Sequence, residues 1–325
     1  MVTIDSHSQI HILVIGTGSI GKRHAGNLAA LGVQTDIFDV NLDLARQISL
    51  ETGSTLVTDL DRALRDGNYQ AAIVCTPNHL HIPIANKVAD ASVNLFIEKP
   101  LSHTFEGVDS LVTKVKENDL IGMAGFNLRY EPGLQFIKNS LKPEEVAFAR
   151  IEFGSYLPSW RPESDYRKTY SANRSMGGGI ILDDVHELDY ACWLFGYPKQ
   201  VGCSLGRFGN LEIDVEDTAE FFLTYMDKLV TVHCDYLQRK YTRTCKICCK
   251  NGDTIEWVFG ESVTVHSDTR GTVFSYRERF KTNDMYLAEM SEFLECLIKK
   301  RTPHSDLENA ARILDIALNA KGVNS

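Results

Sequence analysis

A glycine-rich turn between an apolar run and a helical segment constrains the fold of this chain more than any other feature. The turn is Gly16-Thr17-Gly18-Ser19-Ile20-Gly21, directly after the strand-like run at residues 10–15. Gly16 permits a tight turn, Gly18 lets a pyrophosphate approach the backbone, and Gly21 allows close packing of the helix on the strand. The turn predicts a dinucleotide site; the alternative is a glycine turn that serves packing alone.

Short β-rich runs alternate with helical patterns over the first part of the chain, as in βαβ units. This alternation predicts a Rossmann domain at residues 1–125 with a parallel, doubly wound sheet, whose ligand site lies at the carboxyl ends of the strands. The expected strands cover residues 10–15, 35–39, 54–57, 71–76, 94–97 and 120–125.

Asp39 ends the second expected strand, 18 residues after Gly21. A carboxylate at this place binds a ribose 2'-hydroxyl and repels a 2'-phosphate, so we expect NAD as the cofactor. Asn41 and Arg46 lie nearby and keep NADP open as the less favoured cofactor.

Two further motifs follow later strands of the same sheet. Thr76-Pro77-Asn78 comes after the fourth strand and either faces the nicotinamide end of the cofactor or forms a plain turn with a helix cap. Glu98-Lys99-Pro100 comes after the fifth strand. A lysine beside a bound dinucleotide can donate a hydrogen bond to a substrate oxygen, whereas taken alone it is more often part of a surface ion pair.

The second half of the chain has a different pattern, which predicts an α/β domain at residues 126–325 with an open, mainly antiparallel sheet. One face of this sheet is apolar, and the other can pack against a helix or a second subunit. Alternating strands are expected at residues 146–153, 201–206, 217–225, 229–236, 243–249 and 254–259, and helices near residues 284–299 and 306–320.

Glycines 177–179 lead into a run that predicts one helix ending at Gly196. At 100° per residue, one side of this helix is ionisable and the rest is largely apolar. The ionisable side holds Asp183, His186, Glu187 and Tyr190.

The composition excludes several classes of protein. The 325 residues carry a net charge of -9, so no basic field attracts a nucleic acid. The apolar runs are too short to cross a membrane, and the first residues lack the pattern of a secretory signal, so we expect a cytoplasmic protein. Cys245, Cys248 and Cys249 lie before an Asn251-Gly252 turn without a second cysteine pair, and we expect no metal site.

Four motifs together resemble the Gfo/Idh/MocA family of glucose-fructose oxidoreductase and inositol dehydrogenase. They are Gly16 to His24 (GxGxxGxxH), Thr76-Pro77-Asn78, Glu98-Lys99-Pro100 and Gly177-Gly178-Gly179. The resemblance implies hydride transfer between a nicotinamide cofactor and a hydroxyl or keto carbon of a sugar. It also implies a homodimer or homotetramer formed through the C-terminal sheet.

The resemblance assigns roles to individual residues. Lys99 is implied as the active-site lysine, and Asn127 and Arg129 match the family's segment at the domain junction, where we expect substrate contacts. The residues implied to line the cofactor are Gly16, Gly18, Ser19, Ile20, Asp39, Thr76, Asn78, His81, Glu98 and Lys99, in addition to the packing glycine Gly21.

The resemblance also implies that His186 acts together with Lys99 and that an aspartate one turn earlier points into the same site. The family commonly has this aspartate four residues before the histidine, where this chain has Leu182. We therefore assign the role to Asp183, three residues before His186, and keep Asp184 as the alternative.

The segment at residues 155–170 mixes aromatic and cationic side chains, which suit sugar faces and anionic groups respectively. It predicts a phosphorylated, nucleotide-linked or acidic sugar as substrate, with the anion held by Arg161, Arg167, Lys168 or Arg174. An equally weighted interpretation is that this segment is a structural arm that packs on the sheet or on a neighbouring subunit. The expected substrate contacts in this segment are Tyr156, Trp160, Arg161, Tyr166 and Arg167.

Two other functions stay open at this point. Some members of the family are NAD-dependent glycoside hydrolases, in which the same lysine and histidine serve a transient oxidation. Others are non-catalytic regulators that sense the dinucleotide and have lost catalytic groups. Lys99 and His186 are both present, which argues against a regulator.

Overall fold

The computed structural model describes residues 9–268 and 271–322. These residues form two compact units. The first unit comprises the chain up to Phe126 and residues Tyr286–Arg312, and the second comprises Asn127–Met285 with the residues from Ile313 onward. Residues 286–312 thus pack with the first unit, although the sequence analysis placed everything after residue 125 in the second domain.

The first unit contains a six-stranded parallel sheet with the strand order β3-β2-β1-β4-β5-β6. The Rossmann topology predicted from the sequence is confirmed. The strands are β1 (His11–Ile15), β2 (Gln34–Phe38), β3 (Thr55–Val57), β4 (Ala71–Val74), β5 (Asn94–Glu98) and β6 (Gly122–Gly125). The strand cores at Ile12–Ile15 and Ala71–Val74 are fully buried, as expected of a sheet covered on both faces.

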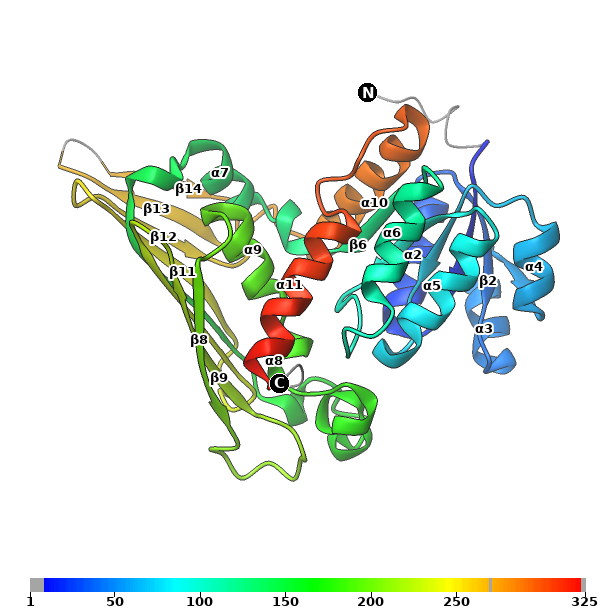
Figure 1. Ribbon diagram of the computed structural model, residues 1–325, viewed down its shortest axis with the longest axis horizontal. Helices are drawn as coiled ribbons and strands as arrows, with labels where there is room; N and C mark the ends of the chain where they lie inside the picture. The colour runs from blue at the N-terminus through cyan, green and yellow to red at the C-terminus, as the bar shows by residue number, and fades with distance from the viewer. Residues whose placement is uncertain (1–8, 269–270, 323–325) are drawn as a thin grey trace. The chain divides into compact units, whose positions relative to one another are not determined.

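Helices join these strands and cover the two faces of the sheet (Figure 1). α2 contacts α3, whereas α5 contacts α4 and α6. Phe293 of α10 packs against Phe96 of β5, so α10 belongs to this unit's core as well. The helices are α2 (Ser19–Ala30), α3 (Leu42–Thr52), α4 (Leu60–Asp66), α5 (His81–Asp90), α6 (Val108–Glu117) and α10 (Thr282–Lys299).

The second unit contains an eight-stranded sheet with the order β14-β13-β12-β11-β7-β10-β9-β8. Neighbouring strands are antiparallel except β7 and β10, which run parallel. The open, mainly antiparallel sheet predicted from the sequence is therefore confirmed. The strands are β7 (Val146–Gly154), β8 (Gln200–Gly206), β9 (Thr218–Thr224), β10 (Leu229–Asp235), β11 (Thr242–Cys249), β12 (Thr254–Val258), β13 (Ser262–His266) and β14 (Thr272–Ser275).

Helices cover one face of this second sheet. α9 (His186–Phe195) contacts β7 and β10, α8 (Ile180–Asp183) contacts β9 and β10, and α7 (Pro132–Ser140) contacts β12 and β13. The last helix of the described residues is α11 (Leu307–Ala320). The three neighbouring cysteines Cys245, Cys248 and Cys249 lie on β11, as the strand interpretation predicts, and all three are free thiols.

The single helix predicted after the glycine run is wrong in one respect. Asp184, with φ -115 and ψ 37, and Val185 separate α8 from α9. Helical angles therefore do not relate Asp183 to His186. At this break the Asp184 carboxylate makes an ion pair with Arg243 of β11, a tertiary contact that local sequence does not reveal. The end of the helix at Gly196, with φ 83, agrees with the prediction.

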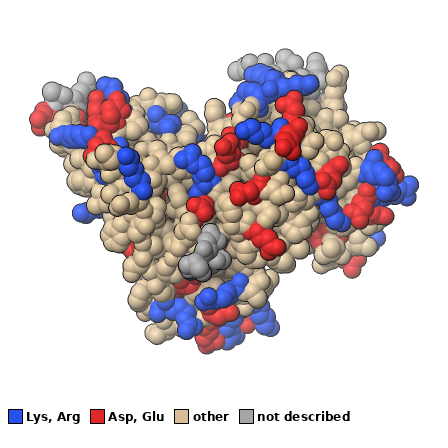
Figure 2. All heavy atoms as spheres, viewed as in Figure 1, with Lys and Arg blue, Asp and Glu red and all other residues tan. Residues whose placement is uncertain are grey.

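Within residues 9–268 and 271–322, no helix has the length and apolar character needed to cross a membrane. On the face drawn in Figure 2, acidic and basic side chains are intermingled. The net charge of -9 is therefore not gathered there into one acidic field.

Candidate active site

The glycine turn in the first unit has room for a ligand at one position and none at the other two. A Cβ atom added at Gly18 would meet no atom within 4 Å, whereas one added at Gly16 would lie 2.7 Å from the carbonyl oxygen of Cys75. Gly18 is exposed and immediately precedes α2, so backbone N–H groups at the start of this helix are open to an anion. The local geometry fits a bound diphosphate.

Asp39 lies directly after β2 and is hydrogen-bonded to the glycine turn. Its Oδ2 atom accepts hydrogen bonds from the backbone N–H of Thr17 at 2.6 Å and from the Thr17 hydroxyl at 3.0 Å. Its Oδ1 atom accepts one from the backbone N–H of Asn41 at 2.8 Å. These contacts fix a negative charge next to the turn.

Thr76 and Lys99 follow β4 and β5 at the same edge of the sheet, since parallel strands end on one side. The Thr76 hydroxyl oxygen is buried without a hydrogen-bond partner in the described part of the chain. Lys99 is half-buried between Glu98 and Pro100, which are both buried. An unsatisfied buried hydroxyl at the carboxyl edge is a further observation that fits a bound cofactor.

His81 and Glu98 were predicted to line the cofactor, and the polar atoms of both side chains contact the protein itself. The two ring nitrogens of His81 lie 2.8 Å from the backbone oxygens of Pro100 and Thr76. Glu98 Oε1 lies 2.6 Å from Nε2 of His24. The exposed fraction is only 1% for His81 and 7% for Glu98.

In the second unit, His186 is the first residue of α9 and is 8% exposed. Asp183, at the end of α8, accepts a hydrogen bond of 2.6 Å from the hydroxyl of Tyr236. The charge of Asp183 also raises the pKa of the neighbouring Tyr170, and burial adds to this effect. Asp183 is thus held as an acceptor by two tyrosines.

Asp184, the alternative to Asp183, belongs to a different cluster. Its carboxylate pairs with the guanidinium of Arg243, whose Nε atom also donates to Glu187 at 2.8 Å. Burial raises the pKa of Glu187 well above its ordinary value, against the opposing effect of Arg243. Asp184 and Glu187 thus share the guanidinium of Arg243, whereas Asp183 contacts tyrosines. The ionisable residues predicted to form one side of this helix therefore lie in two different environments.

Arg129 makes a buried, bidentate ion pair with Asp189 of α9. Nε donates to Oδ2 at 2.9 Å and Nη2 donates to Oδ1 at 2.6 Å. Burial opposes the charge, yet Asp189 raises the pKa of the guanidinium overall. The neighbouring Asn127 is 6% exposed in the same short 3-10 turn. The ion pair gives Arg129 a role in fixing α9, whatever else it contacts.

The segment at residues 155–176 consists of short 3-10 turns and contacts the partners of Asp183. Trp160 packs edge-on against Tyr236, with ring centroids 5.3 Å apart. The Arg161 guanidinium lies over the Tyr170 ring at 5.7 Å. Tyr236 and Tyr170, the two rings in these contacts, are the tyrosines that interact with the Asp183 carboxylate.

The other predicted substrate contacts in this segment are already engaged within the protein. Arg167 is paired with Asp165 and Glu212, each at 2.8 Å. The Tyr156 ring lies beneath the guanidinium of Arg239, and the Tyr166 hydroxyl accepts from the backbone N–H of Glu212.

Sequence reasoning missed three residues that the structure links to these positions. His24, Tyr236 and Arg243 contact Glu98, Asp183 and Asp184 respectively. His24 had a signal, since it closes the GxGxxGxxH motif. Tyr236 and Arg243 had none, because Tyr236, directly after β10, and Arg243, on β11, lie more than fifty residues from Asp183 and Asp184 in the sequence.

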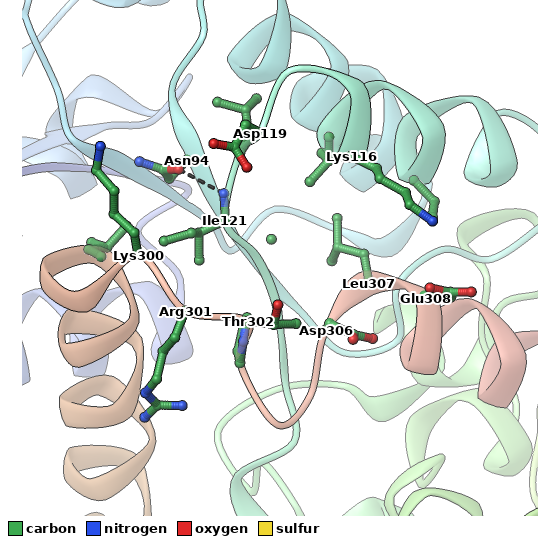
Figure 3. A pocket seen from close by; sticks show the side chains of 16 residues that line it. Asn94, Lys116, Asp119, Ile121, Lys300, Arg301, Thr302, Asp306, Leu307 and Glu308 are labelled. Atoms are coloured by element: carbon green, nitrogen blue, oxygen red, sulfur yellow. Dashed lines mark hydrogen bonds between the residues drawn. The ribbon is translucent and has the colours of Figure 1, made fainter.

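A cavity of about 490 Å³ lies elsewhere in the first unit. It is lined by Asn94 and Gly122, which begin β5 and β6, and by the segment between α10 and α11 (Figure 3). The side chain of Asn94 accepts a hydrogen bond from Ile121 N–H in its wall. Because these are the amino ends of the strands, the cavity is at the opposite edge of the sheet from the glycine turn.

Comparison with known proteins decides the family. Residues 10–126 match the oxidoreductase family GFO/IDH/MocA, NAD-binding Rossmann fold, and residues 145–255 match the GFO/IDH/MocA C-terminal domain. The chain belongs to the Gfo/Idh/MocA family. The family predicted from the four motifs is therefore confirmed, as is an NAD-binding Rossmann domain.

Two relatives of this Gfo/Idh/MocA protein illustrate the range of the family. Myo-inositol 2-dehydrogenase of Thermotoga maritima is 25% identical, and the alignment covers 96% of this chain and 95% of that enzyme. Levoglucosan dehydrogenase of Pseudarthrobacter phenanthrenivorans is 30% identical, over 61% of this chain and 54% of that enzyme.

Solved structures share the whole fold. UDP-N-acetylglucosamine 3-dehydrogenase from Acidithiobacillus ferrooxidans superposes with a TM-score of 0.82 at 21% identity, covering 96% of this chain and 97% of that one. A levoglucosan dehydrogenase complex with NADH and levoglucosan gives a TM-score of 0.86 at 19% identity, covering 97% and 98%.

Proposed function

We propose that this protein is an NAD-dependent dehydrogenase or reductase acting on a CH–OH group of a sugar or cyclitol. The observation that carries the proposal is Lys99 at the carboxyl end of β5, on the same sheet edge as a glycine turn that is open at Gly18. Membership of an oxidoreductase family and the named sugar and inositol dehydrogenases among the relatives support it.

The cofactor site is assigned to residues at the carboxyl edge of the first sheet. Backbone N–H groups of Gly18, Ser19 and Ile20 face the diphosphate, and Thr76 and Asn78 lie toward the nicotinamide. Asp39 takes the ribose hydroxyls, and its fixed carboxylate favours NAD over NADP by repelling a 2'-phosphate. Bound NAD supplies the hydride acceptor.

Lys99 and His186 divide the handling of one substrate hydroxyl between them. Lys99 donates a hydrogen bond to the hydroxyl oxygen and stabilises the negative charge that develops there. His186 removes the hydroxyl proton, a task suited to histidine because its ordinary pKa lies near neutrality. Asp183 orients the imidazole or recharges it, and Tyr236 keeps this carboxylate in place.

The finer proposal for the substrate is a nucleotide-linked, phosphorylated or acidic sugar. Arg161 is the cation that best supports it, because it is exposed and lies over Tyr170, which contacts Asp183. Arg167 and Arg174 are less suited, since Asp165, Glu212 and the Asp214 backbone already accept their hydrogen bonds. Trp160 offers an aromatic surface next to Tyr236.

A second copy of the chain is the proposed partner of the uncovered face of the second sheet. Phe148 of β7 lies in register with Leu229 of β10, and Phe222 of β9 with Thr231. Phe148, Leu229 and Phe222 are 36%, 43% and 44% exposed. Exposed apolar rows on a sheet face favour a homodimer or homotetramer through this surface.

The test follows NADH absorbance with a panel of neutral cyclitols, anhydro sugars, sugar phosphates and nucleotide sugars. Lys99→Met and His186→Ala should each retain NADH binding and reduce kcat by roughly 100-fold or more. Unchanged turnover in either variant removes that residue from the mechanism. If neutral cyclitols react as well as every anionic sugar, the proposal of an anionic sugar substrate is wrong. If no sugar or cyclitol is turned over, the proposed dehydrogenase function is wrong.

A further inference from the structure

Two buried histidines contact the short segment that carries Lys99. His24 reaches Glu98, the residue before the lysine, and His81 reaches Pro100, the residue after it. Neither histidine is more than 1% exposed. Both therefore face the protein interior, where a buried ring nitrogen is stabilised by a polar partner; both nitrogens of His81 have one, whereas in the described residues only Nε2 of His24 does.

His24 connects the glycine turn to the lysine. It lies on α2, which starts at that turn, and its Nε2 atom is 2.6 Å from Glu98 Oε1. The other carboxylate oxygen of Glu98 accepts a hydrogen bond from the backbone N–H of Lys99 at 3.2 Å. Rings of Phe96 and Tyr286 pack edge-on against the imidazole, at 5.3 and 6.1 Å, and fix its orientation.

His81 connects the loop after β4 to the segment after β5. Its Nδ1 atom is 2.8 Å from the backbone oxygen of Pro100, and its Nε2 atom is 2.8 Å from that of Thr76. Burial lowers the pKa of this histidine, and the neutral ring has one N–H to donate. The ring lies between two loops of the proposed cofactor site and, when neutral, donates its N–H to one of the two carbonyl oxygens at a time.

We infer that His24 and His81 are positioning residues for Lys99, holding its backbone on both sides through the Glu98 carboxylate and the Pro100 carbonyl. This inference rests on the proposed function for its kinetic consequence. Hydride transfer depends on the placement of the ammonium group, and a displacement of about 1 Å costs up to about 100-fold in rate. Binding of the cofactor does not depend on the lysine placement to the same degree.

Replacing His81 by Asn or Gln separates its contacts with Pro100 and Thr76. The side-chain amide of Asn occupies the position of Nδ1, and the side-chain amide of Gln occupies the position of Nε2. His81→Asn keeps a donor near Pro100, and His81→Gln keeps one near Thr76. We expect kcat to fall roughly tenfold or more in His81→Gln relative to His81→Asn, and the Kd for NADH to rise more in His81→Asn. Equal effects of the two variants on kcat would overturn the role of His81.

For His24, the readout is hydrogen exchange at the Lys99 amide, which does not require a substrate. His24→Ala should speed this exchange at least tenfold, and His24→Gln should recover most of the protection and of the kcat. His304→Ala, at a 74% exposed histidine of the same unit, is the matched control. If the Lys99 amide of a folded His24→Ala variant exchanges at the wild-type rate, the inference is overturned. If the exchange is faster in the variant but the wild-type protein turns over no sugar, only the proposed function is overturned.

Discussion

Gly21 of α2 packs directly against Gly16, so that a Cβ atom added at Gly21 would lie 1.9 Å from the carbonyl oxygen of Gly16. Gly18, between them in the turn, faces open space. The same motif therefore contains two glycines that the fold requires, Gly16 and Gly21, and a third, Gly18, that leaves space for a ligand. The two demands can be separated by mutation.

Gly21→Ala should destabilise the protein by about 1–3 kcal/mol, because the backbone of the turn must shift to admit the methyl group. Gly18→Val should leave the unfolding midpoint in urea nearly unchanged and weaken NADH binding. Urea denaturation and fluorescence titration with NADH measure the two effects. A Gly18 variant that binds NADH normally would show that no diphosphate approaches this turn.

Asp39→Ser should shift the cofactor preference. Removing the carboxylate removes repulsion of a 2'-phosphate, a like-charge effect of several kcal/mol, so kcat/KM for NADP relative to NAD should rise at least about tenfold. Thr17→Val is the control, since it removes one hydrogen bond to Asp39 and keeps the negative charge. An equal shift in both variants would mean that the shape of the turn, and not charge, sets the preference.

Arg129→Met should lower the free energy of unfolding by about 3–5 kcal/mol, because Asp189 would be left as an unpaired buried charge. The double variant Arg129→Met with Asp189→Met should recover much of that loss. Thermal and urea unfolding of the three proteins test this. A double variant as unstable as the single one would indicate that Arg129 acts through packing, for example on Trp193.

The contacts of His233 indicate that the free energy of unfolding depends on pH. Hydrogen bonds to Asp235 and Glu220 raise its pKa to about 9, against the effect of partial burial. A pKa above the ordinary value of 6.5 means that the folded state holds the proton more tightly, so this stabilisation is complete below pH 6.5 and is lost as pH rises through 9. The Tm difference between the wild type and His233→Gln should therefore shrink between pH 6 and pH 10. Glu220→Gln should move that loss to lower pH, and a difference independent of pH would contradict the assignment.

Phe222→Glu should dissociate the proposed oligomer, because a carboxylate would replace an exposed apolar ring on the uncovered sheet face. Light scattering after size exclusion gives the mass. Leu50→Glu, at an 82% exposed residue of α3, should leave the mass unchanged. An oligomer that survives Phe222→Glu would place the subunit contact elsewhere.

The first sheet was predictable because each of its strands is a local apolar run followed by a turn signal, and parallel order follows from helical crossovers. The glycine turn and Asp39 could be placed for the same reason. The ion pair of Asp184 could not, since its partner Arg243 lies fifty-nine residues later in the sequence. The contacts of Asp183 with Tyr236 and of Glu98 with His24 also depend on pairings between distant segments, which hydrophobic periodicity does not encode.

The return of α10 to the first unit has a consequence for how the protein is made. A chain released after Phe126 would lack Tyr286 and Phe293, which pack on His24 and Phe96. The nucleotide-binding unit is thus completed only when the ribosome has also synthesised residues Tyr286–Arg312. Nascent intermediates would expose the sheet surface that this late helix covers, and they are the species for which we expect chaperone dependence.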